Sequence, residues 1–232
     1  MNSTQSKPKD RRSPAISTIG HIPAACLVGF LILWALVAMD PKHRLVWAIE
    51  NVLVVPFVLL LVATYHRFQF TGRAYLQMTT FLVLHTVATH SSYAEAPLGM
   101  FIRDALQSDR NPYDRLAHFS FGFFMLCPLR ELVMRYARDV GAFFQLTVAY
   151  LALGFAAMSY ELIEWGVAVL AVTSAGAHVR EALPTTVAFL AIQNDAWDVQ
   201  KDMALACLGG LLAMLLELRG FTRPSCADSG AR

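Results

Sequence analysis

The sequence predicts an all-α fold: a polytopic integral membrane bundle of about six transmembrane helices. Hydrophobic residues make up 56% of the 232-residue chain and charged residues 16%, whereas an ordinary soluble domain carries about 25% charged residues. The mean hydropathy is +0.47. The apolar residues fall in six long runs separated by short charged segments, and a helix needs about 20 apolar residues to cross a bilayer.

The six candidate spans follow one another with mostly short linkers. They cover residues 22–39, 45–65, 74–90, 113–134, 141–170 and 198–218. Basic residues precede the first span, as in a signal peptide, but its apolar stretch is longer than the usual run of about 7–15 residues. We therefore expect it to be retained as a helix. The fifth span is longer than the membrane core is thick, which predicts that it tilts or extends beyond the bilayer.

The remaining segments define the domain organisation. Residues 98–106 have the pattern of a short helix lying at the membrane interface, and residues 185–192 form an apolar stretch that is too short to span. We expect a single transmembrane helical domain over residues 22–219, between a disordered basic cytoplasmic tail at 1–21 and a cytoplasmic tail at 220–232. Most of the 19 lysines and arginines lie on the side of the two tails. Because such residues favour the cytoplasm, both termini are predicted to be cytoplasmic.

Composition also excludes several classes of function. The net charge is only +2, which indicates no nucleic-acid partner. The four cysteines, Cys26, Cys127, Cys207 and Cys226, form no CxxC pair, so we expect neither a disulfide framework nor a zinc ribbon. The partner that the sequence predicts is the membrane lipid bilayer, and it identifies no protein partner.

Ionisable side chains gather at matching ends of five spans, counting Glu50 near the start of the second. Because consecutive spans run in opposite directions, these ends meet at one membrane face, which the predicted topology places outside. The main members are His85, His90, Asp114, His118, Glu161, Glu164, Asp198 and Asp202. An ionisable residue at the centre of a membrane helix costs about 2.5–3.5 kcal/mol, so we expect these side chains to face one another or a wet cavity.

Helical spacing supports this convergence. Asp114 and His118 are four residues apart, which is about 40° around a helix, and Glu161 and Glu164 are three apart, about 60°. The two histidines that end the third span are five residues apart and diverge by about 140°. Only one of these two histidines is therefore expected to face the group, unless the helix ends between them.

The composition of the group leaves several functions open. Acids outnumber bases, and neighbouring carboxylates repel unless protons or cations lie among them. The group could bind a divalent metal ion, do acid–base chemistry on an envelope substrate, or relay protons in a proton- or cation-coupled transporter. A scaffold without chemistry is a further alternative. The inner halves of the spans offer few polar residues beyond Gln77, Thr79, Thr80 and Gln145, which counts against transport.

Two overlapping sets of residues carry these hypotheses. The candidate catalytic residues are Asp114, His118, Glu161, Glu164, Asp198 and Asp202. The candidate metal ligands are His85, His90, His118, Glu161, Glu164, Asp198 and Asp202. A divalent metal ion is the one cofactor that the pattern indicates. The sequence contains no HExxH, GxSxG or P-loop motif, so no familiar reaction is assigned.

Five motifs around these residues together resemble a known family. They are HxxxxHSSYAEAPLG at 85–99, NPYDRxxHF at 111–119, PLRE at 128–131, YELIEW at 160–165 and QNDAWDVQKDM at 193–203. They resemble the YjdF-like family of bacterial inner membrane proteins over most of the chain beyond the N-terminal tail. The resemblance implies a multi-pass protein of the bacterial inner (plasma) membrane and implies no particular activity.

A looser likeness connects the chain to VanZ-like proteins. Their Asp-Lys-x2-His-Phe motif is similar to residues 114–119 here, with Arg115 in place of the lysine. Their late span with aspartate and small residues is similar to the segment from Asp198 to Gly210. Asp202 stands where an amide side chain is expected, so this likeness implies no transferable function.

Overall fold

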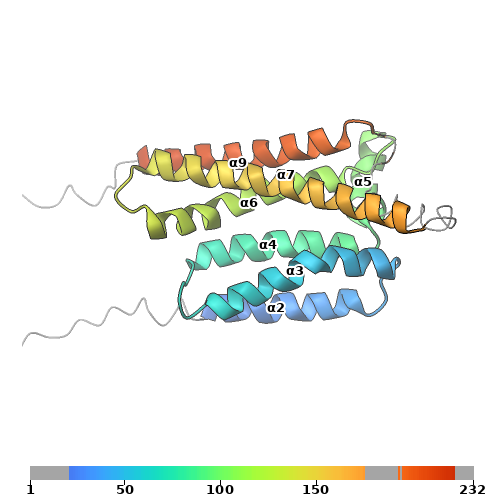
Figure 1. Ribbon diagram of the computed structural model, residues 1–232, viewed down its shortest axis with the longest axis horizontal. Helices are drawn as coiled ribbons and strands as arrows, with labels where there is room; N and C mark the ends of the chain where they lie inside the picture. The colour runs from blue at the N-terminus through green and yellow to red at the C-terminus, as the bar shows by residue number, and fades with distance from the viewer. Residues whose placement is uncertain (1–20, 176–192, 194, 223–232) are drawn as a thin grey trace, which may run out of the picture.

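The computed structural model describes residues 21–175, 193 and 195–222, and these residues are helical apart from short connections. Six long helices run side by side along the bundle axis, and both described termini lie at the same end (Figure 1). The long helices are α2 (His21–Ala38), α3 (Arg44–Thr64), α4 (Gly72–Thr89), α6 (Tyr113–Tyr136), α7 (Ala142–Ala175) and α9 (Asp198–Thr222). The 3-10 helix η1 (Tyr93–Glu95) and the short helix α5 (Pro97–Leu106) connect α4 to α6.

These bounds confirm the all-α prediction and the six predicted helices, whose ends differ by only a few residues. The short helix predicted at 98–106 is also present, as α5. Helix α9 continues to Thr222, past the expected boundary of the transmembrane domain at residue 219. The apolar stretch at 185–192 and most of the two tails lie outside the described residues.

Within the described residues, five helices are long and apolar enough to cross a membrane: α2, α3, α6, α7 and α9. Helix α4 is different because it lies between the other helices and carries polar side chains toward them. Its buried residues include His85, Thr86 and Thr89. The third predicted span is therefore an interior helix of the bundle and is not among the five helices apolar enough to cross a membrane.

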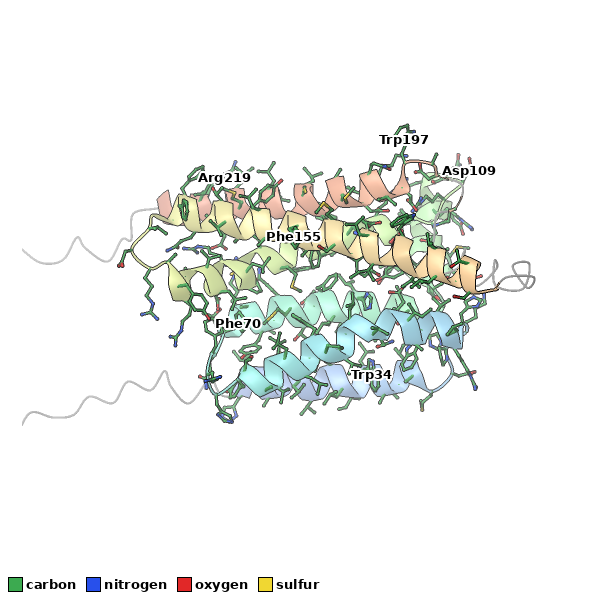
Figure 2. All side chains as sticks on the ribbon, in the orientation of Figure 1. Trp34, Phe70, Asp109, Phe155, Trp197 and Arg219 are labelled. Atoms are coloured by element: carbon green, nitrogen blue, oxygen red, sulfur yellow. The ribbon has the colours of Figure 1, made fainter. Side chains whose placement is uncertain are left out.

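The helices form two groups of three. Helices α6, α7 and α9 all pack against one another, and α4 packs closely against α2 and more sparsely against α3. Contacts between α4 and α6 join the two groups (Figure 1). The faces of α3 and α7 toward the surroundings carry large apolar side chains, including Leu59, Phe155 and Leu162 (Figure 2 labels Phe155). Such faces suit a lipid environment.

Helices α6 and α9 make the closest helix contact of the fold, because small residues let their backbones approach. A Cβ atom added to Gly122 would lie 1.8 Å from the carbonyl oxygen of Ala206, and one added to Gly209 would lie 2.1 Å from that of Phe119. Small residues at such a crossing are the usual means of close packing between membrane helices. This contact fixes the start of α9 against the start of α6.

Local sequence explains where the interior helices begin and bend. The hydroxyl of Thr71 accepts a hydrogen bond from the backbone N–H of Ala74 at 3.2 Å and so caps α4. Pro56 and Pro128 lie inside α3 and α6; prolines are tolerated within membrane helices when neighbouring groups replace the lost hydrogen bond. Neither proline ends its helix.

Candidate metal centre at the polar end of the bundle

Buried ionisable groups occupy the end of the bundle opposite the described termini, which we call the polar end. Helix α6 begins there with Asp114 and His118, and α9 begins with Asp198 and Asp202. Glu161 reaches the same region from α7. All five side chains are buried: Asp202 is 3% exposed and Glu161 is 5% exposed. The structure therefore brings together residues from three helices that the sequence placed in one group.

Three of these residues form a compact group of possible metal ligands. Asp114, His118 and Asp202 each offer one ligand atom, and the three atoms lie within 4.8 Å of one another. Nε2 of His118 lies 3.6 Å from Oδ1 of Asp114 and 3.4 Å from Oε1 of Glu161. Two ligands of a tetrahedral zinc ion are about 3.4 Å apart. The spacing around His118 therefore matches the edges of a small metal-coordination shell.

Basic side chains at the polar end pair mainly with acidic side chains outside the group of three possible metal ligands. Arg110 forms an ion pair with Asp198 and lies 3.4 Å from Oδ2 of Asp114. Asp195 pairs with Arg115, and the Nζ of Lys201 lies 2.6 Å from its Oδ2. The hydrogen bonds from Lys201 lower the pKa of the Asp195 carboxyl below its usual range. Asp195 and Asp198 are thus neutralised by arginine and lysine.

Two carboxylate oxygens next to His118 lack such a partner. Oδ1 of Asp202 and Oε1 of Glu161 are fully buried and accept no hydrogen bond within the described part of the chain. A buried carboxylate without a donor is costly, and acids crowded together repel unless protons or cations lie among them. Shared protons or a bound cation among Asp114, His118, Asp202 and Glu161 would relieve this cost, and the spacing of the ligand atoms suits a cation.

A second polar group flanks the first on its α3 and α4 side. The phenol of Tyr160 donates a hydrogen bond to Oε2 of Glu50 at 3.1 Å. The phenol oxygen of Tyr93 lies 2.5 Å from Nδ1 of His85. Burial raises the pKa of the Tyr93 phenol well above its usual range, so this phenol keeps its proton at neutral pH and can donate a hydrogen bond to Nδ1 of His85.

The two remaining histidine and glutamate candidates take different positions. His90 is exposed at the end of α4, where its Nδ1 lies 3.1 Å from the carbonyl oxygen of Val37, so the structure does not bring it to the group. Glu164 is half-buried one helical turn from Glu161 and lies near Tyr160 rather than among the three metal-ligand candidates. Of the pair that ends α4, His85 faces inward.

The connection between α4 and α6 covers the polar end and is held by one buried side chain. The amide nitrogen of Asn111 donates to the carbonyl oxygens of Ala94 and Ala96 at 3.0 and 3.1 Å, and its amide oxygen accepts from the N–H of Tyr113 at 3.0 Å. Gln193 bonds to the backbone of Asn111 in both directions, at 2.8 and 3.1 Å. These bonds fix the first turn of α6, which carries Asp114.

The outer rim of this connection is tied to the start of α3. Nζ of Lys42 lies 2.8 Å from Oε2 of Glu95, and Nε2 of His43 lies 3.2 Å from the same oxygen. The hydrogen bond from Lys42 lowers the pKa of the Glu95 carboxyl. This exposed tie contributes little stability, because solvent screens surface ion pairs, but it positions η1 over His85.

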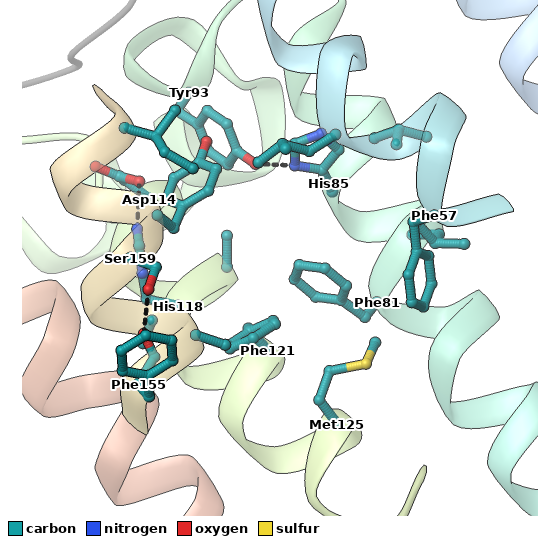
Figure 3. A pocket seen from close by; sticks show the side chains of 18 residues that line it. Phe57, Phe81, His85, Tyr93, Asp114, His118, Phe121, Met125, Phe155 and Ser159 are labelled. Carbon is teal, nitrogen blue, oxygen red and sulfur yellow. Dashed lines mark hydrogen bonds and ion pairs between the residues drawn. The ribbon is translucent and has the colours of Figure 1, made fainter. Parts of the chain in front are cut away.

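A cavity of about 510 Å³ adjoins the metal-ligand candidates and extends between the two helix groups. Asp114, His118 and His85 line its polar part, and apolar side chains such as Phe81 and Met125 line the remainder. Figure 3 shows His118 and Asp114 on one side of this space and Phe81 across it. The site therefore borders a largely apolar cavity between the two helix groups.

Three residues of this arrangement and one role were not predicted from the sequence. Arg110 was not singled out, and Tyr93 and Tyr160 were noted only within motifs. The signal for Arg110 was present, since it precedes Asp114 by four residues. Asp114 was a catalytic candidate only, whereas the structure includes it among the three residues able to hold a metal.

Such a site can support metal-assisted chemistry. Three protein ligands of the carboxylate and imidazole type leave a coordination position open for water or substrate. A metal ion at such a position makes bound water more acidic or polarises an oxygen of the substrate. Glu161, beside His118 but outside the group of three, would serve as a proton acceptor or donor for such a water if a metal were bound.

Comparison with known proteins gives a consistent setting for this site. Residues 22–223 match a family described as predicted membrane protein (DUF2238). The inner membrane protein YjdF of Escherichia coli (strain K12) is 33% identical over 185 residues, which cover 78% of this chain and 81% of that protein. No solved structure matches the chain. These descriptions give a membrane location and state no activity.

Proposed function

This chain belongs to the DUF2238 family of membrane proteins, and from that premise we propose that it binds a divalent metal ion inside the bundle through Asp114, His118 and Asp202. We further propose that the metal, together with Glu161, does hydrolytic or transfer chemistry on a substrate at the membrane surface. The observation that carries the proposal is the buried side chain of Asp202: its Oδ1 has no hydrogen-bond donor in the described residues, and one of its carboxylate oxygens lies within 4.8 Å of ligand atoms of His118 and Asp114.

The ligand set indicates which ions suit the site. Carboxylates favour magnesium, calcium and manganese, whereas imidazole favours zinc, iron, copper and nickel. One imidazole with two carboxylates is compatible with zinc, manganese or ferrous iron. Nδ1 of His118 is then free to be oriented by a second partner, as is usual for histidine ligands.

The orientation of the site completes the proposal. By the order of the spans in the sequence, most of the 19 lysines and arginines fall on the side of the two tails. Because basic residues favour the cytoplasmic side, the termini would be cytoplasmic and the polar end would face the periplasm. The chemistry would then act on a component of the cell envelope.

The transporter alternative receives less support. Between the polar end and the opposite end, the described core is a continuous apolar cluster that includes Met78, Leu126 and Leu153. A transport path for protons or cations needs polar groups or water through this region. The apolar core favours chemistry confined to the polar end.

The test of the proposal is metal content of the full-length protein in detergent. We expect about one equivalent of metal in wild type after incubation with zinc, manganese or ferrous iron. Asp202→Asn and His118→Ala should lose this metal, because each removes a ligand atom. Asp104→Asn is the matched control, since it changes an exposed carboxyl near the same end and should keep the metal.

Two results would contradict the metal proposal. Folded wild type could hold no metal under any of the three conditions, or both ligand variants could retain it at the level of the control. Circular dichroism and gel filtration establish that each variant is folded, so that loss of metal is separated from loss of structure.

A further inference from the structure

The cavity beside the candidate metal centre has the position and lining expected of a site for an apolar hydrocarbon chain. It lies in the seam between the two helix groups, where α4 and α6 form its inner wall. Phe81, Phe121 and Met125 make most of this wall apolar, Phe57 of α3 adds to the apolar lining, and polar side chains occur at one end (Figure 3). Its volume of about 510 Å³ is within the range of about 300–1,000 Å³ that small-molecule sites occupy.

The cavity opens sideways toward lipid. Three of its lining residues, Leu53 on α3 and Phe155 and Ile163 on α7, are also 44%, 67% and 47% exposed on the outer surface of the bundle. Over their described residues, α3 and α7 do not pack closely against each other. A molecule dissolved in the bilayer could therefore enter between these two helices without crossing water.

A polar bridge closes the gap at the polar end. Tyr160 on α7 donates a hydrogen bond to Glu50 on α3, and both helices carry exposed apolar residues on the side of this bridge nearer the described termini. The side opening therefore lies beside the apolar parts of α3 and α7. It ends where the hydrogen bond between Tyr160 and Glu50 joins the two helices. An amphiphile with its head at this level would match both environments.

The chamber is continuous with the metal-ligand candidates. Asp114 and His118 belong both to the group of three and to the cavity wall. Asp202 belongs to the group but is not part of the cavity wall. A head group at the polar end of the cavity would thus meet the same two side chains that face a bound metal.

We propose that the cavity holds one acyl chain of a bilayer phospholipid that enters between α3 and α7, with its head group against Asp114 and His118. Binding of the acyl chain requires only the apolar walls of the cavity and its side opening. The contact between a phosphate head group and a metal ion rests on the proposed function, because the acidic side chains alone would repel a phosphate. The substrate class of the site would then be a membrane lipid.

The test uses a phosphatidylglycerol that carries a diazirine near the end of one acyl chain. The full-length protein is placed in vesicles of phosphatidylethanolamine and phosphatidylglycerol with this probe, illuminated, and mapped by peptide mass spectrometry. We expect labelled residues on the inner wall, at Phe81, Phe121 or Met125, besides the exposed helix surfaces. Label confined to the exposed surfaces would overturn the proposal.

Cavity-filling variants provide the specific test. Ala156→Phe adds volume at the cavity wall and should lose the inner-wall label. Leu151→Phe is the control, because Leu151 is 65% exposed on the same helix and does not line the cavity. Ala117→Leu is a second filling variant on α6, used if Ala156→Phe does not fold. Inner-wall label that persists in a folded filling variant would contradict lipid entry.

Two further measurements separate this proposal from the metal site. Asp202→Asn should lose metal yet keep the inner-wall label, since Asp202 is not in the cavity wall, whereas Ala156→Phe should keep metal and lose the label. A small water-soluble diazirine should label the inner wall weakly. Strong inner-wall labelling by the water-soluble probe would show a water-filled chamber and would overturn the lipid proposal.

Discussion

Replacing Gly122 with alanine should disrupt both the α6–α9 contact and the candidate metal centre. An added Cβ would lie 1.8 Å from the carbonyl oxygen of Ala206 and 2.8 Å from the backbone nitrogen of Gly210. A carbon atom normally stays about 3.3 Å or more from a carbonyl oxygen, so the shortfall is about 1.5 Å. Because the opposing atoms are backbone, no side-chain rotation relieves this clash, and the two helices must move apart.

The expected losses of stability and of metal binding follow from how far the two helices must move apart. Overpacking a close contact costs about 1–3 kcal/mol of stability. A backbone clash with a shortfall of about 1.5 Å should cost at least the upper value of that range. Gly122 and Ala206 each lie four residues, or about 6 Å, from His118 and Asp202 along their helices. Metal bonds of about 2.0–2.2 Å bridge ligand atoms at most about 4.4 Å apart. A separation of about 1.5 Å would take Asp202 out of reach.

The assay combines thermal unfolding in detergent with a metal-binding titration. We expect Gly122→Ala to lower the unfolding free energy by about 3 kcal/mol or more and to weaken metal binding by at least about tenfold, which is 1.4 kcal/mol. Gly166→Ala is the control, because no atom lies within 4 Å of its added Cβ. A Gly122→Ala protein with the stability and metal affinity of that control would show that the α6–α9 contact does not require glycine at this position.

Three further perturbations test the framework around the site. Asn111→Ala removes three buried hydrogen bonds and should lower the unfolding free energy by about 2–4 kcal/mol; an unchanged denaturation midpoint would contradict that role. Hydrogen bonds from Lys201 lower the folded-state pKa of Asp195, so its stabilisation is complete above the unfolded value of about 4 and is lost as the pH falls below it. Amide-exchange protection in the first turn of α9, relative to the intrinsic rate at each pH, should therefore fall below about pH 4 in wild type but already be reduced at pH 7 in Asp195→Asn, and identical protection profiles would argue against the pair. Arg73→Ala removes an ion pair between the exposed Arg73 and Glu217, which keeps its pair with Arg130, and should cost less than about 1 kcal/mol; a loss of several kcal/mol in the same unfolding assay would contradict this expectation.

The helices could be predicted from sequence because hydropathy and length act locally. Each long apolar run became a helix whose bounds differ by a few residues from the prediction. The third span shows the limit of this reasoning, because α4 is surrounded by other helices and its polar residues His85, Thr86 and Thr89 are buried there. Hydropathy sets α4 apart from the five helices that could cross a membrane, but it does not say which helices surround α4, because those contacts join segments far apart in the sequence.

The candidate site was predictable as a group but not in its internal geometry. Alternating helix direction sufficed to bring Asp114, His118, Glu161 and Asp202 to one end. Periodicity predicted that only one of the two histidines at the end of α4 would face inward, and the structure selects the one nearer the helix centre. The role of Arg110 depends on how α9 lies against α6, which glycine contacts between distant segments determine.

The most direct test of the metal centre is X-ray absorption spectroscopy of the metal-loaded, full-length protein. We expect nitrogen and oxygen ligands at about 2.0–2.2 Å from the metal ion. The outer-shell signal of one imidazole should be present in wild type and disappear in His118→Ala. Sulfur in the first shell, or an imidazole signal that persists in His118→Ala, would contradict the assignment of Asp114, His118 and Asp202 as the ligands.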